Sequence, residues 1–322
     1  MPSRPSDSVV FSSGVPIAVR DFGGEGAGIV LVHGLGRTLL DWTVIGPLLA
    51  RRHHVVALDV RAHGKSGDGP WSWLAAIDDV AAVATSCDMP DPAVVGHSLG
   101  GMIATMWGQH HPDCTGVVNL DGHGNPRPDQ YVGLDPDWVA ERRAESVALR
   151  AKTLQALSGP LSAQQVGALV AQQKSVAGQV GAPVELFVEA THRSLDVRDG
   201  QAYLRPSPAG AGGDMMAAVD ECDMLTLYRQ VRCPLLVVAG TRPEADYGDD
   251  AAGVAWIHEL LAAFRKGVTR DLTELAAEQA NVRFEAVDGS HALPFEQPQL
   301  IADLVLDFLS TARAARPAST KP

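Results

Sequence analysis

The chain has 322 residues, of which 46% are hydrophobic and 20% charged, and its formal net charge is −12. This length and composition are typical of a globular protein with a substantial core, in one large domain or two modest ones. The acidic balance argues against nucleic acid or an anionic membrane surface as a partner.

The N-terminus lacks the apolar core of a signal peptide, and no apolar run approaches the roughly 20 residues that span a bilayer. We therefore expect a cytoplasmic protein. The cysteines have neither C-x-x-C nor zinc-finger spacing, so we expect reduced, mostly buried thiols and no metal site. They are Cys87, Cys114, Cys222 and Cys233.

Short apolar runs alternate with helix-compatible segments over the first 124 residues. An opening hairpin is expected at Val9–Phe11 and Pro16–Arg20. Buried strands are predicted at Gly28–Val32, Val55–Leu58, Ala93–Val95 and Gly116–Leu120. Helices are predicted at Trp42–Arg51 and Ser72–Ala84, and a third helix is predicted to follow the third of these strands and to end at about His110. This alternation predicts an α/β fold, with a mostly parallel sheet covered by helices on both faces.

The alternation stops at Asn125, and residues 125–228 are expected to form a mostly helical cap over the strand ends. Its helices are predicted at Trp138–Ala156, Ala163–Ser175 and Val184–Ser194, with a turn and short extended segment at Asp199–Arg205 and a loop at Pro208–Gly213. The core, residues 1–124 and 229–312, resumes with strands at Pro234–Ala239 and Val282–Val287 and helices at Val254–Ala280 and Pro298–Ala312. Residues 313–322 are expected to be a disordered tail.

One motif carries a specific chemical prediction. Gly96, Ser98 and Gly100 have the spacing G-x-S-x-G, after an apolar strand and before an apolar helix. The glycines allow a tight turn that exposes the serine hydroxyl above the sheet, where the helix N-terminus favours negative charge. Ser98 is therefore the candidate nucleophile. Because a serine hydroxyl needs a nearby base, His291, just past the last predicted strand, is the candidate base.

Four segments together resemble the α/β-hydrolase superfamily over roughly residues 9–312. They are His33-Gly34-Leu35-Gly36, the stretch from Asp59 to Ser66, the Gly-His-Ser-Leu-Gly-Gly turn and Gly289-Ser290-His291. The resemblance implies an α/β-hydrolase fold and the order serine, acid, histidine along the chain. It also implies an oxyanion hole formed by the backbone N–H groups of Leu35 and Leu99. His33 and His97 are expected to make structural hydrogen bonds nearby.

The acid has three candidates. Most α/β-hydrolases carry it after the penultimate strand, where this chain has Gly-Thr-Arg-Pro followed by Glu244 and Asp246. Some haloalkane dehalogenases and zearalenone-type lactonases instead carry it after the strand that follows the nucleophile helix. Asp121 stands there, and we favour it, with Glu244 and Asp246 as alternatives.

A serine nucleophile favours acyl transfer to water. We expect a serine hydrolase that cleaves a carboxylester or lactone of a small to medium hydrophobic substrate through an acyl-enzyme, without a cofactor. Non-hydrolytic use of the same residues (acyl transfer, lyase or perhydrolysis chemistry) and a catalytically silent ligand-binding protein remain as alternatives. Candidate pocket residues are His123, Trp138, Phe187 and Met215, although the last three also fit simple packing within the cap.

Overall fold

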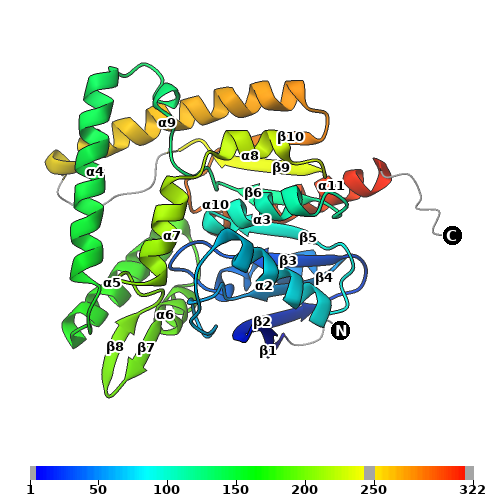
Figure 1. The fold of residues 1–322 in the computed structure, drawn as a ribbon, viewed down its shortest axis with the longest axis horizontal. Coiled ribbons are helices and arrows are strands. Elements are labelled where there is room, and N and C mark those ends of the chain that lie inside the picture. Colours follow the sequence, from blue (N-terminus) through cyan, green and yellow to red (C-terminus); the bar gives the residue numbers. More distant parts are fainter. Residues whose placement is uncertain (1–4, 243–250, 316–322) are drawn as a thin grey trace.

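A computed structural model describes residues 5–242 and 251–315 of the chain. Its main feature is one eight-stranded sheet (Figure 1). The strands are β1 Ser6–Ser12, β2 Val15–Gly23, β3 Gly28–Val32, β4 His54–Leu58, β5 Ala93–His97, β6 Val117–Leu120, β9 Leu235–Gly240 and β10 Val282–Val287. Their spatial order is β1-β2-β4-β3-β5-β6-β9-β10, and every pair from β4 to β10 is parallel. The predicted α/β fold class is confirmed.

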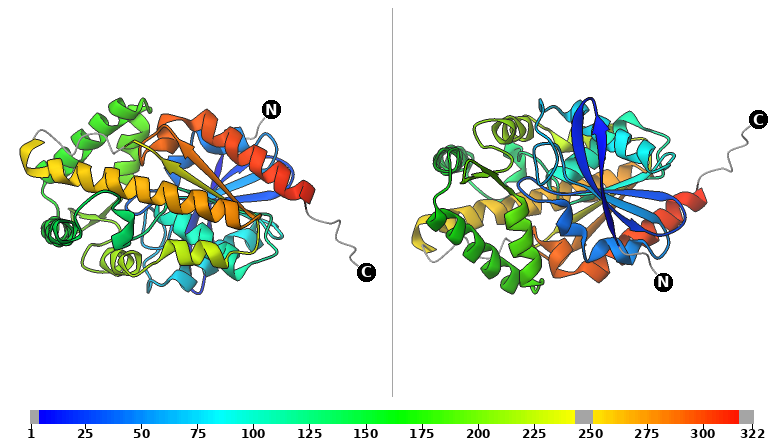
Figure 2. Two further views of the ribbon diagram at one scale, coloured as in Figure 1. Left: turned by 90° about the horizontal axis from the view of Figure 1, so that it is seen from above. Right: turned by 90° about the horizontal axis from the view of Figure 1, so that it is seen from below.

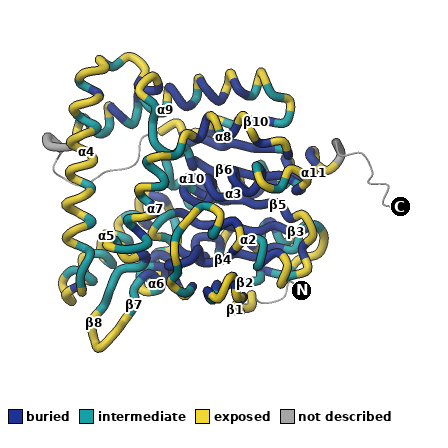
Figure 3. Tube along the Cα trace, viewed as in Figure 1, coloured by how far each residue is buried: buried dark blue, intermediate teal, exposed yellow. Residues whose placement is uncertain are grey.

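Helices cover both faces of this sheet. Along β3, Val30 and Val32 pack into a core with α2 (Trp73–Ser86), α3 (Leu99–His110) and α9 (Ala251–Glu278). The alternate residues Ile29 and Leu31 pack into a second core with α1 (Ile45–Leu49) and α11 (Pro298–Ala315). The central strands are accordingly the most deeply buried part of the molecule (Figure 3). Such fully apolar strands are characteristic of parallel sheets.

Most of the segment between β6 and β9, which we call the insertion, gathers at one end of the sheet, whereas its last helix packs against α3 on one face of the sheet (Figures 1 and 2). It contains η2 Pro128–Gln130, α4 Pro136–Ala156, α5 Ala163–Val180, α6 Val184–Arg193, β7 Leu195–Arg198, β8 Gln201–Leu204, α7 Ala211–Asp220 and α8 Met224–Gln230. The predicted helices are present, and α7 begins inside the predicted loop Pro208–Gly213. No described helix is long and apolar enough to cross a membrane.

One local prediction was wrong for an identifiable reason. The helix expected at Trp42–Arg51 is a short 3-10 turn, η1 (Leu39–Trp42), followed by α1. Pro47 lacks an N–H and is tolerated only in a first helical turn, so the helix starts at Ile45. The turn and short extended segment predicted at Asp199–Arg205 are present: they are the turn and the second strand of a hairpin in which β7 pairs with β8. Its turn, Asp199-Gly200, has positive φ at both residues, as an Asp-Gly hairpin turn requires.

The end of the chain also differs from the prediction. Helix α11 continues through Ala315, so the first residues of the predicted disordered tail are helical. The rest of that tail, residues 316–322, lies outside the described residues. So do Glu244 and Asp246, the alternative candidates for the acid.

The turn between β5 and α3 is held by close backbone packing. Ser98 has φ 55° and ψ −120°, a conformation rare for a residue with a side chain. Its flanking glycines are indispensable: a Cβ on Gly96 would lie 1.8 Å from the carbonyl oxygen of Gly100, and a Cβ on Gly100 would lie 2.0 Å from that of Val32. The backbone of α3 therefore rests directly on the ends of β5 and β3.

This packing predicts that Gly96→Ala destabilises the protein by at least about 2 kcal/mol, because the turn must open to admit a methyl group. Urea unfolding followed by circular dichroism measures the change. Gly167→Ala is the matched control, since Gly167 is exposed on α5 and a Cβ there meets nothing within 4 Å. That variant should gain up to about 1 kcal/mol from helix propensity. Equal stabilities for the two variants would contradict the packing account.

Candidate active site

A pocket of about 270 Å³ opens at the carboxyl ends of the parallel strands. The strand ends supply Leu35 after β3, Ser98 after β5, Asp121 after β6, Gly240 from β9 and His291 after β10. Loops at this edge of a parallel sheet converge, which is why residues distant in sequence meet here. The structure thus brings Ser98, Asp121 and His291 into one pocket.

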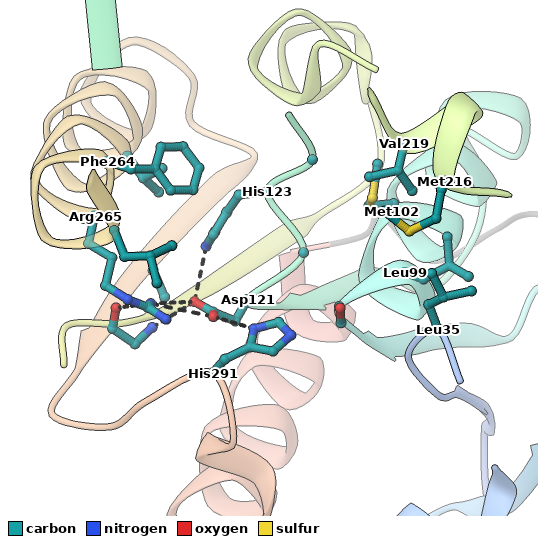
Figure 4. Close-up of a pocket in the computed structure, with 17 residues that line it drawn as sticks. Leu35, Leu99, Met102, Asp121, His123, Met216, Val219, Phe264, Arg265 and His291 are labelled. Atoms are coloured by element: carbon teal, nitrogen blue, oxygen red, sulfur yellow. Dashed lines mark hydrogen bonds and ion pairs between the residues drawn. The ribbon is translucent and has the colours of Figure 1, made fainter. Parts of the chain in front are cut away.

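His291 and Asp121 are directly bonded. The Nδ1 of His291 lies 2.7 Å from Oδ2 of Asp121, a short distance consistent with a charge-assisted hydrogen bond (Figure 4). This contact fixes the tautomer of His291: Nδ1 carries the proton, so Nε2 is the ring nitrogen with an acceptor lone pair. The Asp121 side chain is only 3% exposed, whereas that of His291 is 34% exposed.

Asp121 is held by several further groups. Its Oδ1 lies 2.9 Å from the backbone N of Gly240 and 3.2 Å from Nε2 of His123. The guanidinium of Arg265, on α9, approaches both carboxylate oxygens at 3.3 and 3.4 Å. Burial alone would raise the pKa of Asp121, but the hydrogen bonds from His123 and His291 outweigh burial and hold this pKa well below its usual range. The carboxyl is therefore ionised near neutral pH.

The loop that carries His291 is anchored by His97, the residue before Ser98. The Nε2 of His97 donates to the backbone oxygen of His291 across 2.7 Å. Burial, followed by the nearby His291 ring, lowers the pKa of His97 to about 3, so His97 is neutral. His97 was expected to make a structural hydrogen bond near the site. The bond it makes joins the end of β5 to the loop after β10.

Two buried histidines support the loop after β3. His33 Nε2 accepts a hydrogen bond from the N–H of Val60, and His63 Nε2 accepts one from the N–H of Gly36. Burial lowers the pKa of both rings, and it lowers that of His63 well below the ordinary histidine value. The loop is pressed against the nucleophile turn, since a Cβ on Gly34 would lie 3.1 Å from the Ser98 Cβ. This places Leu35 beside Leu99, the first residue of α3, whose N–H has no acceptor within the helix.

The pocket has a polar side and an apolar side. His123, Phe264 and Arg265 lie on one side of Asp121 and His291, while an apolar group lies on the other (Figure 4). The apolar group consists of Leu35, Leu99, Met102, Met216 and Val219. Met216 and Val219 come from α7, so the insertion supplies part of the pocket wall.

Of the four predicted pocket residues, the structure places His123 in the pocket wall and the other three in packing positions. Trp138 packs with Tyr131 and Leu260 against α9. Phe187 is 2% exposed and contacts the ring of Phe295, and Met215 is fully buried in the core. Helical periodicity explains why Met215 faces inward while its neighbour Met216 lines the pocket.

Sequence reasoning missed Arg265. It lies far along the chain from the recognisable motifs, on an amphipathic helix where an arginine ordinarily faces water. No signal in the sequence marks it as a neighbour of Asp121. Among the described residues, no group of three or more histidine, cysteine or carboxylate side chains is placed to hold a metal ion.

Comparison with known proteins places this geometry in context. A family model described as the alpha/beta hydrolase family matches residues 29–304. The chain is 26% identical to a fluoroacetate dehalogenase of Burkholderia sp. over 327 aligned positions, which cover 91% of this chain and 90% of that protein. It is 27% identical over 223 positions to a pimeloyl-[acyl-carrier protein] methyl ester esterase of Chromobacterium violaceum, covering 68% of this chain and 77% of the esterase.

The fold also matches solved structures. The crystal structure of E-2-(acetamidomethylene)succinate hydrolase superposes with a TM-score of 0.68 at 20% identity, covering 95% of this chain and all of that one. At this identity the likeness is one of fold.

The buried neutral His97 predicts a pH-dependent stability. Because its pKa of about 3 in the folded protein lies below the ordinary histidine value, the unfolded state binds more protons between these values. The free energy of unfolding should therefore fall as pH drops from about 6.5 towards 3. His97→Asn keeps a side-chain N–H donor and removes the titration, so its slope should be smaller by up to about 1.4 kcal/mol per pH unit. Urea unfolding at several pH values measures the slopes, and identical slopes would refute the assignment.

Proposed function

Because the chain belongs to the alpha/beta hydrolase family, we propose that it is a serine hydrolase that cleaves a carboxylic ester or lactone through an acyl-enzyme. The observation that carries the proposal is the 2.7 Å bond between His291 and Asp121, in the same pocket as Ser98. A serine on a strained turn, a histidine with a fixed tautomer and an ionised acid are the parts that this chemistry requires.

The proposed reaction proceeds in two halves. His291 Nε2 takes the hydroxyl proton as Ser98 Oγ bonds to the acyl carbon, and the carbonyl π electrons move to oxygen. Collapse of this intermediate breaks the bond to the leaving oxygen, which receives the proton from His291. Water then attacks the acyl-enzyme by the same route and releases the acid and free Ser98. Asp121 stabilises the imidazolium in both halves.

The negative oxygen of each intermediate needs donors that are already in place. Leu99 is the first residue of α3, so its N–H lies at the N-terminal end of the helix, where the helix dipole is positive. The N–H of Leu35 is the second proposed donor, in the loop that packs against Ser98. Loss of one such donor costs about 3 kcal/mol in comparable enzymes.

The serine separates the proposed reaction from that named for the Burkholderia relative. A serine oxygen that displaced a halide from carbon would form an ether, and water near neutral pH does not cleave an alkyl ether. The same oxygen attached to an acyl group forms an ester, which the His291-activated water can hydrolyse. The name of the Chromobacterium relative, a methyl ester esterase, agrees with this chemistry.

The pocket limits the substrate. A cavity of about 270 Å³ suits a small to medium acyl group, and the methionines Met102 and Met216 give its apolar side an adaptable surface. An acyl or alkoxy portion with apolar character fits that side. The proposed substrate is therefore a compact ester or lactone.

The first test concerns the nucleophile. A fluorophosphonate probe should label the protein at Ser98 with one-to-one stoichiometry, measured by intact mass and peptide mapping. Ser98→Ala should abolish labelling and lower hydrolysis of a generic short-chain p-nitrophenyl ester by at least about 10⁴-fold. Ser86→Ala, which removes an exposed hydroxyl at the end of α2, is the control and should behave as wild type. Undiminished labelling of Ser98→Ala would refute the proposal.

The second test concerns the acid. Asp121→Asn should lower kcat by about 10³- to 10⁴-fold, because an amide N–H facing His291 favours the wrong tautomer. Asp288→Asn is the matched control, since this carboxylate is 86% exposed and lies three residues before His291. Steady-state kinetics with the same ester provide the comparison. Full activity in Asp121→Asn would transfer the role of acid to another carboxylate.

A further inference from the structure

Arg265 joins three elements at the polar end of the pocket. From α9, its Nη1 donates to the carbonyl oxygen of Gly240 at 2.6 Å, at the end of β9. The same nitrogen lies 3.3 and 3.4 Å from the two carboxylate oxygens of Asp121 (Figure 4). The Arg265 side chain is only 12% exposed. A permanent positive charge is therefore held, largely out of water, against the carboxylate that bonds to His291.

The two oxygens of Asp121 have different partners. Oδ1 is occupied by the Gly240 N–H and His123, and Oδ2 accepts the short bond from His291. Turning the carboxylate about its Cβ–Cγ bond would exchange these partners at the cost of several hydrogen bonds. Arg265 lies against both oxygens at 3.3 and 3.4 Å and so favours this orientation of the carboxylate, while the shorter 2.7 Å contact of Oδ2 is with His291.

We propose that Arg265 is a positioning residue of this site, which orients the Asp121 carboxylate and offsets part of its charge so that His291 stays neutral and able to accept a proton. The inference rests on the proposed function, because it assigns Arg265 a role in the same reaction. A carboxylate with no neighbouring cation would stabilise the His291 imidazolium more strongly and would leave less of the free base near neutral pH.

Arg265 differs from the other groups around the pair because its guanidinium lies directly against the carboxylate. The titratable groups near Asp121 and His291 include His97 from β5, His123 after β6 and Tyr228 from α8. The charge of Arg37 also acts on the His97 ring, but this guanidinium pairs with Asp41 at 2.7 Å. Burial keeps His97 neutral and raises the pKa of Tyr228 well above the ordinary value, so neither is charged near neutral pH. His123 shares the carboxylate through Oδ1.

Charge and hydrogen bonding can be separated by substitution. Arg265→Gln keeps a side-chain N–H for Gly240 and removes the charge, whereas Arg265→Lys keeps the charge. Loss of the positive charge favours the imidazolium, so the titration midpoint of His291 should rise by about 0.5 to 1 pH unit in Arg265→Gln and stay near wild type in Arg265→Lys. Arg270→Gln is the matched control: this arginine is 41% exposed on the same helix and pairs with Asp271.

Two measurements carry the test. NMR titration of the histidine rings, with His291 assigned from His291→Gln, reports the midpoint without any substrate. The acid limb of the kcat/KM profile should move by the same amount and in the same direction. Equal midpoints for wild type and Arg265→Gln would overturn the proposal, as would an equal shift in Arg265→Gln and Arg265→Lys, which would trace the effect to packing.

The NMR measurement distinguishes failure of this inference from failure of the proposed reaction. If Ser98 resists the fluorophosphonate and no ester is hydrolysed, the proposed function fails, and the NMR midpoints still decide whether Arg265 sets the charge state of His291. If Asp121→Asn loses activity while Arg265→Gln leaves the midpoint unchanged, the function stands and the role of Arg265 is refuted. Thermal melting of each variant shows whether it is folded before either comparison is made.

Discussion

The Asp121 carboxylate is the point on which the geometry of this pocket depends. It lies where β6 ends, at a residue with a backbone φ of 55°, a conformation uncommon for a residue with a side chain. Its two oxygens tie together the ends of β9 and β10 and the middle of α9. A buried ionised group is stable only when hydrogen bonds and opposite charge replace its lost water, and each of its partners serves that need. The same bonds define the orientation of His291.

The turn that carries Ser98 also packs against the residues that flank Asp121. The N–H of Ser98 donates to the carbonyl oxygen of Leu120, and a Cβ on Gly122 would lie 2.3 Å from the Ser98 carbonyl oxygen. The residues on either side of Asp121 are thus in direct contact with the backbone of the nucleophile turn. Strain at Ser98 persists because the surrounding backbone leaves it no other conformation.

Much of the fold was predictable because it depends on local patterns. Continuous apolar runs located the central strands to within a residue or two, and the confirmed resemblance rested on four short motifs at strand ends. The remaining features depend on contacts between distant segments. Whether Met215 or Met216 faces the pocket depends on the rotation of α7, and the approach of Arg265 to Asp121 depends on how α9 crosses the sheet. Apolar periodicity specifies neither.

The chain order of these residues has a consequence for biosynthesis. Ser98 and Asp121 lie on one continuous strand-helix-strand unit, so their relative placement is complete once β5, α3 and β6 have formed. His291 arrives some 170 residues later and is fixed there by His97 and Asp121. A nascent chain released before β10 docks would therefore carry the serine and the acid without their base. The chemistry proposed for this protein can begin only after nearly the whole chain has emerged and folded.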